Sequence, residues 1–86
     1  MALRLRTDDL EWREIDSDIV VLDARDASYL TLNRSGALLW RMLAAGATRD
    51  QLVGALLAAF DLDEATAAAD TDVFLATVSA YGLLAS

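Results

Sequence analysis

The sequence predicts an α+β domain in which a three-stranded antiparallel sheet is followed by three helices. Two observations indicate this order. Residues 10–32 contain three short strand-like runs separated by polar turns, and residues 33–82 contain three apolar patterns with helical spacing, each bounded by capping residues. The chain has 86 residues, no proline and no Gly/Ser-rich linker. A single domain spanning 1–86 is therefore expected.

The three predicted strands differ in character. Polar and apolar residues alternate over 10–15, which is the period of a half-buried strand, whereas 19–23 is more continuously apolar, as in a central strand. The third strand covers 28–32. Polar turns at 16–18 and 24–27 connect the three runs.

The strand 28–32 ends the small sheet, so one of its edges should be unpaired. Along it Tyr29 and Thr31 point to one face, and Leu30 and Leu32 point to the other. An open strand edge accepts a peptide as one more strand. This feature predicts a binding module rather than a catalyst.

The first two helices carry start and stop signals. Ser35 is expected to cap the first, which ends at Gly46. Thr48 caps the second, and Gln51 three residues later completes a capping box. The expected core positions of the two helices are Leu38, Leu39, Met42, Leu43, Leu52, Val53, Leu56, Leu57 and Phe60. Trp40 is expected to pack where the first helix meets the sheet, and Trp12 to anchor its strand.

Asp63 is expected to cap the third helix, which runs to about Tyr81 before Gly82 ends it. Its largely apolar arc spans roughly 200° at about 100° per residue. The members of this arc are Asp70, Thr71, Val73, Phe74, Leu75, Thr77, Val78 and Tyr81. Covering one face of a core needs a stripe of somewhat over about 100°. The surplus either faces a partner or packs in a terminal helix clasped between the sheet and the other helices.

Composition excludes several function classes. The absence of cysteine and histidine removes disulfides, Cys/His metal sites and the commonest general base, and the serines have no partner for a hydrolytic triad. The carboxylates at 8–9, 61–64 and 70–72 fit helix caps and solvated surfaces better than catalytic pairs or a calcium loop. We therefore expect no catalytic residue, no metal and no cofactor.

Charge and hydropathy limit the partners. The net charge is −7, and the seven arginines are dispersed singly, which disfavours nucleic acid. No run approaches the roughly 18–20 apolar residues of a membrane span. Residues 1–9 lack the features of a signal peptide, so a cytoplasmic protein without a membrane partner is expected.

A longer pattern of three parts runs along the chain. Its first two parts are YLTLNRSGALLW at 29–40 and TRDQL at 48–52. Its last part consists of Asp70, Phe74, Leu75, Val78, Gly82 and Leu83. In order and spacing these pieces resemble the PqqD-like family of peptide-recognition domains over about residues 10–84. The short form with VLD before the turn is most similar to the discrete leader-recognition proteins of lasso-peptide pathways. The Leu-Tyr-Pro-Glu-Gly-like hairpin of PqqD itself is replaced by LDARD at 22–26.

The resemblance implies a winged-helix-like fold and a ligand. Family members bind the leader of a precursor peptide as an added antiparallel strand, in the groove between the third strand and the third helix. The matching positions here are Ser28, Tyr29, Leu30, Thr31, Leu32, Asp70, Val73, Phe74, Thr77 and Tyr81. Arg25 and Asp72 are weaker candidates for fixing the peptide register. The implied partners are a leader protease and an ATP-dependent cyclase, both separate chains.

Three alternatives remain open at this point. A PqqD-type chaperone of another modified-peptide pathway would use the same groove. A winged-helix DNA-binding regulator shares the helix order, but its second helix would offer only Arg49 beside Asp50 to a phosphate backbone. An antitoxin-like or structural dimerisation domain would pair two copies through the same strand edge.

Overall fold

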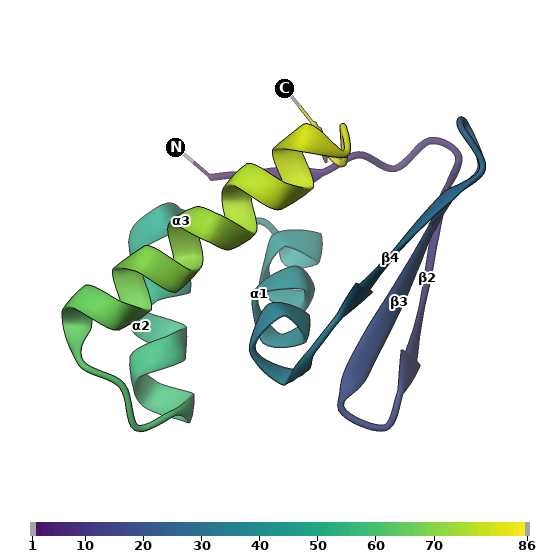
Figure 1. Ribbon diagram of the computed structural model, residues 1–86. Helices are drawn as coiled ribbons and strands as arrows, with labels where there is room; N and C mark the ends of the chain where they lie inside the picture. Colours follow the sequence, from purple (N-terminus) through teal and green to yellow (C-terminus); the bar gives the residue numbers. More distant parts are fainter. Residues whose placement is uncertain (1, 86) are drawn as a thin grey trace.

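The computed structural model describes residues 2–85. Three antiparallel strands form one sheet in the order β2-β3-β4: β2 (Leu10–Ile15), β3 (Asp18–Asp23) and β4 (Ser28–Leu32). The helices α1 (Arg34–Ala45), α2 (Arg49–Ala59) and α3 (Glu64–Ala80) follow along the chain and lie on one side of the sheet (Figure 1). This arrangement confirms the predicted α+β order.

The two faces of the sheet differ as the alternation predicts. Trp12 pairs with Val21, and Val21 with Leu30, so these three side chains share the face toward the helices. Tyr29 and Thr31 are exposed on the opposite face. We call these the inner and the outer face of the sheet. The predicted boundaries hold within one residue, because Asp18, expected in the turn, already belongs to β3.

The cap of α1 differs from the prediction. Asn33, not Ser35, is the N-cap, and its side-chain Oδ1 accepts a hydrogen bond from the Gly36 backbone N–H at 3.2 Å. Ser35 is the second residue of the helix, and its hydroxyl donates to the same Asn33 oxygen at 3.2 Å. Gly46 ends the helix at a φ of 91°, a left-handed value that glycine adopts without a steric penalty.

The starts of α2 and α3 are confirmed. The Thr48 hydroxyl accepts from the Gln51 N–H while the Gln51 side chain accepts from the Thr48 N–H, as a capping box requires. Asp63 caps α3 by accepting from the Thr66 N–H at 2.8 Å. One core prediction on α2 is wrong: Leu57 is 38% exposed, because the α2 face toward the core is narrower than the apolar pattern.

The core lies between the inner face of the sheet and the three helices. Trp40 on α1 is fully buried at the centre of this core. Trp12 on β2 packs against Trp40 with the two indole rings edge to face and their centroids 6.2 Å apart. Both tryptophans therefore have the packing roles that the sequence predicts. The other large, fully buried apolar side chains are Ile19, Val21, Leu39, Leu43, Leu52, Leu56, Val78 and Leu83.

A second, very short sheet joins the two ends of the described chain. The strand β1 (Arg4–Leu5) pairs antiparallel with β5 (Leu84–Ala85). A strand of two residues is too short to display any alternation, so this pair leaves no signal in the sequence. Among residues 2–85, no helix is long and apolar enough to cross a membrane.

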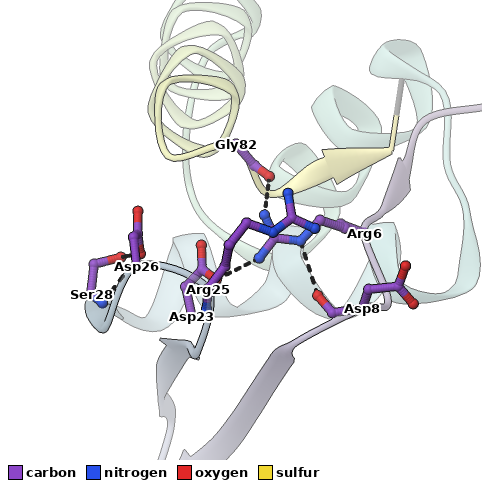
Figure 2. Close-up of polar contacts among 7 residues, drawn as sticks. All are labelled: Arg6, Asp8, Asp23, Arg25, Asp26, Ser28 and Gly82. Carbon is purple, nitrogen blue, oxygen red and sulfur yellow. Dashed lines mark hydrogen bonds and ion pairs between the residues drawn. The ribbon is translucent and has the colours of Figure 1, made fainter.

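A partly buried arginine connects this short sheet to the main sheet and to α3. The Arg6 guanidinium donates to the Asp23 carboxylate at 2.6 Å, to the Gly82 carbonyl at 2.8 Å and to the Asp8 carbonyl at 3.1 Å (Figure 2). Asp23 is only 5% exposed and also accepts from the Arg25 N–H. This group, which we call the Arg6 clasp, fixes the start of the β3–β4 turn against the end of α3.

Candidate functional site

β4 forms an outer edge of the three-stranded sheet, and the hydrogen-bond alternation decides which of its backbone groups are free. In an antiparallel pair, residues that exchange hydrogen bonds alternate with residues that do not. The Ala24 N–H donates to the Asp9 carbonyl at 2.9 Å, at the end of the β2–β3 ladder. Every second residue back along β3, such as Leu22, therefore points its backbone groups toward β2. The residues between them, such as Val21, point theirs toward β4.

The same alternation continues into β4. Val21 lies opposite Leu30, so the backbone groups of Leu30 are directed at β3. Those of Tyr29 and Thr31 consequently face away from the sheet. These two residues offer an incoming strand two donors and two acceptors, spaced as an antiparallel ladder requires.

A hollow of about 500 Å³ lies directly beside this edge, between β4 and α3. Leu30, Thr31 and Leu32 line it from the strand, and the core leucines Leu39 and Leu56 line its floor. On the helix side it is lined by Asp70, Val73, Phe74 and Thr77. We call this hollow the β4–α3 groove. Figure 1 shows that β4 and α3 run in opposite directions.

The α3 side of the groove includes an apolar residue that the core does not use. Ala67, Thr71, Phe74 and Val78 form the buried stripe of the helix. Val73 lies outside it and is 66% exposed. The surplus apolar arc expected from the sequence is thus real at Val73. Phe74 belongs to both regions, since it is 7% exposed, packs in the core and also lines the groove.

The charged residues at the groove are acidic. Asp70 lines it from α3, and Asp18 lines it at the end of β4 where Asn33 also lies. None of the lining residues is an arginine. The groove therefore favours a ligand that is apolar at its centre and neutral or basic where it meets these carboxylates.

Asp72, a weaker sequence candidate, is not at the groove. Its carboxylate receives two hydrogen bonds from the Arg49 guanidinium of α2, at 2.7 and 2.9 Å. These hydrogen bonds lower the pKa of Asp72 below its ordinary value of 3.8. The pair is exposed and contributes little to stability. Asp72 thus connects α2 to α3 in the free protein.

The remaining sequence candidates divide between other places. Ser28 and Tyr29 line a second hollow, of about 540 Å³, at the β3–β4 turn. Tyr81 is the C-cap of α3, 42% exposed, and lines neither hollow. Arg25 is exposed within the turn. The structure therefore brings seven of the ten main candidates together at the groove: Leu30, Thr31, Leu32, Asp70, Val73, Phe74 and Thr77.

Some groove residues were not identified from the sequence as site residues. Leu39 and Leu56 were assigned to the core only, since nothing in a helical pattern distinguishes a core leucine from one at the floor of a groove. Asp18 was assigned to a turn. The remaining members are Asn33, Ser35 and Gly36, at the start of α1.

The chemistry that this arrangement supports is non-covalent binding of an extended chain. Backbone groups along β4 provide hydrogen bonds, and the adjoining groove provides apolar contact. Within residues 2–85, no three acidic side chains gather in a way that would hold a metal ion.

The family model described as "Coenzyme PQQ synthesis protein D (PqqD)" matches residues 18–84. The comparison with curated protein sequences gives no match.

Two solved structures share the fold. The structure described as "TbiB1 in Complex with the TbiA(beta) Leader Peptide" is 26% identical, with a TM-score of 0.85 over 94% of this chain and 93% of that one. The structure described as "Lasso peptide synthetase B1 complexed with the leader peptide" is 23% identical, with a TM-score of 0.84 over 98% of each chain.

Proposed function

This chain belongs to the PqqD family, and from that membership we propose that it binds the leader segment of a ribosomally made precursor peptide. The leader adds to β4 as a further antiparallel strand and lies in the β4–α3 groove. The bound peptide is then presented to separate processing enzymes of a lasso-peptide pathway, a leader protease and an ATP-dependent cyclase. The two solved relatives with this fold, each in complex with a leader peptide, support this proposal.

One observation carries the proposal. The edge of β4 whose backbone groups are free borders a groove of about 500 Å³ that is open to solvent and has an apolar floor. A strand edge alone would bind peptide backbone without selectivity, and a groove alone would bind many apolar side chains. Their coincidence fits an extended peptide that has side chains of a defined kind on one face.

The two parts contribute differently to affinity. Each backbone hydrogen bond to Tyr29 or Thr31 contributes roughly 0.5–1.5 kcal/mol net, whatever the leader sequence. Side chains of the leader that enter the groove contact Val73 and Phe74, and each well-buried apolar side chain contributes about 1.5–3 kcal/mol. Selectivity for one leader therefore comes from the groove, while the strand edge fixes direction and register.

The chain itself has an adaptor role in this proposal and performs no chemistry. Its substrate-like ligand is held by backbone and apolar contacts along one side of the domain. The leader protease and the cyclase act on the portion of the precursor that extends beyond the bound segment.

The first experiment is a fluorescence-anisotropy titration of the protein against labelled leader peptides. The peptides are translated from short open reading frames beside its gene, and each is paired with a scrambled version of the same composition. Saturable binding with a Kd of about 1 μM or tighter is expected for one leader and not for its scrambled form. Binding of both forms alike would contradict recognition of a sequence. Sedimentation of the free protein in parallel tests pairing of two copies through β4, which would be the leading account if no leader binds.

A further inference from the structure

The second hollow is separate from the groove and lies at the turn end of the sheet. It is lined by residues of β2, β3 and β4 and by the β3–β4 turn, and its volume is about 540 Å³. Leu22 and Tyr29 form a cross-strand pair that lines it on the outer face of the sheet. Leu22 is 41% exposed and Tyr29 is 69% exposed, so this apolar pair lacks a covering element within residues 2–85.

The polar groups around the turn are largely occupied by one another. The Asp23 carboxylate accepts from Arg6 and from the Arg25 N–H, and the Asp26 carboxylate accepts from the Ser28 hydroxyl at 2.6 Å (Figure 2). The hydrogen bonds from Ser28, its hydroxyl first, lower the pKa of Asp26. These groups are therefore poor candidates for contacting a ligand.

Two carboxylates at the hollow are different. Asp9 and Glu11 line it and are exposed. None of the three ion pairs among residues 2–85 involves either of them. An apolar surface beside two unpaired carboxylates is complementary to an apolar side chain that has a lysine or arginine close to it in sequence.

The two hollows follow one another along β4. Residues 30–32 of the strand line the β4–α3 groove, and Ser28 and Tyr29 line the second hollow. A peptide paired antiparallel to β4 runs from Leu32 toward Ser28 and advances about 3.4 Å per residue. Its C-terminal continuation therefore leaves the edge of β4 beside the second hollow.

We propose that the second hollow binds the stretch of the leader that follows the strand-paired segment, through an apolar side chain placed over Leu22 and Tyr29 and a basic side chain near Glu11. This inference rests on strand addition to β4. It assigns the leader two recognition elements: an upstream element in the groove on the inner side of the sheet, and a downstream element on the outer face. It also gives the side chain of Tyr29, which lies outside the groove, a role in peptide binding beyond its backbone hydrogen bonds.

The test combines a nested set of leaders with matched variants of the protein. The probe is the labelled leader that binds in the titration above, together with versions shortened stepwise from the C-terminal end. Leu22→Ser alters the second hollow at an exposed position. Ile15→Ser is the control, because Ile15 is exposed on the same face of the sheet at its opposite end.

Leu22→Ser is expected to weaken binding of the full leader about fivefold, as partial loss of one apolar contact predicts. It should leave binding of the shortest binding leader unchanged, and Ile15→Ser should affect neither peptide. Glu11→Gln should weaken the full leader about twofold at low salt and not at high salt, because exposed charge pairs are weak and screened.

Several results would overturn the inference while leaving the proposed function intact. These are equal affinity of long and short leaders, an equal effect of Leu22→Ser on both, or unchanged affinity with slower cleavage by the leader protease. The last would assign the hollow to the enzyme instead. Failure of every leader to bind the unaltered protein would instead reject the proposed function itself.

Discussion

The two edges of the same small sheet are very different. β2, with the sequence LEWREI, has three charged residues among six, whereas β4, with the sequence SYLTL, has none among five. Charged side chains on an edge strand discourage pairing with another chain. β2 is thus protected in the usual way, and β4 is not.

The surroundings of the two edges strengthen the contrast. α3 stands beside β4 with an intervening groove, and Val73 presents an exposed apolar side chain there. The β2 edge instead has an exposed ion pair nearby, between Glu14 and Arg41 of α1 at 3.2 Å. The comparison teaches that an edge strand without charged residues indicates a binding site for an extended peptide when a groove lies beside it.

The largest effect is expected from a proline on the β4 edge. Thr31→Pro removes an outward N–H and places a ring where the leader must approach, so leader affinity should fall more than about tenfold. Glu14→Pro is the matched control, because Glu14 occupies an outward-facing position on β2 by the same alternation. Anisotropy titration measures both variants. Equal loss of binding in the two would remove the distinction between the edges.

A smaller loss of leader affinity is expected from a charge on the α3 side of the β4–α3 groove, which has no counterpart beside β2. Val73→Asp should weaken leader binding about fivefold to tenfold, since a carboxylate replaces an apolar contact in the groove. Val73 is 66% exposed in the free protein, so unfolding stability should change by less than about 1 kcal/mol.

The control for that variant is Ala76→Asp, an exposed position on the same helix that does not line the groove. It introduces the same charge into α3 and should bind the leader normally. Thermal melts of both variants show whether the fold is retained. A comparable loss of affinity in Ala76→Asp would indicate a general charge effect and not a groove contact.

Removing the protection of β2 should have a still smaller consequence. The double variant Arg13→Thr with Glu14→Thr leaves that strand with Glu11 as its only charge. Weak self-association at high protein concentration is expected, because an edge strand with fewer charges is more open to pairing. Sedimentation velocity of the variant and the unaltered protein measures it, and an unchanged sedimentation coefficient would show that charge does not protect this edge.

The smallest effect is the loss of stability at low pH through the N-cap of α3, the helix that lies beside the β4 edge and not beside the β2 edge. The Thr66 side chain and backbone N–H lower the pKa of the Asp63 carboxylate below 3.8. A lowered folded-state pKa contributes stability that is complete above the unfolded value and is lost as pH falls through the folded one.

Asp63→Asn keeps an N-cap acceptor without a titrating group. Between about pH 5 and pH 2.5, the Tm of the unaltered protein should therefore fall slightly more than that of the variant. Identical pH profiles would mean that the Asp63 cap makes no titrating contribution to the stability of α3.

Local signals predicted most of the secondary structure. The capping box of Thr48 with Gln51 and the cap at Asp63 depend only on neighbouring residues, and both are confirmed. The cap of α1 was placed wrongly because Asn33 and Ser35 are both good cap residues. The direction of the preceding backbone, which enters from β4, places the Asn33 side chain within reach of the Gly36 N–H.

Features that depend on residues distant in sequence were harder to predict. The β1–β5 pair and the Arg6 clasp join residues more than seventy positions apart and leave no periodic signal. The strand and helix sides of the candidate site came from the family pattern and from the surplus arc on α3. Its floor at Leu39 and Leu56 could not be distinguished from the core in the sequence. That the backbone groups of Tyr29 and Thr31 face away from the sheet follows only from the register of β4 with β3.

The β1–β5 pair has a consequence for the order in which the molecule folds and opens. Its hydrogen bonds close a loop of nearly the whole chain, which costs more entropy than closing either hairpin of the main sheet. We expect the hairpins and helices to form first and the chain ends to join last. In hydrogen exchange, the amides of Leu3 and Arg6, which bond to Ala47 and Leu83, should then open ahead of the Trp40 core.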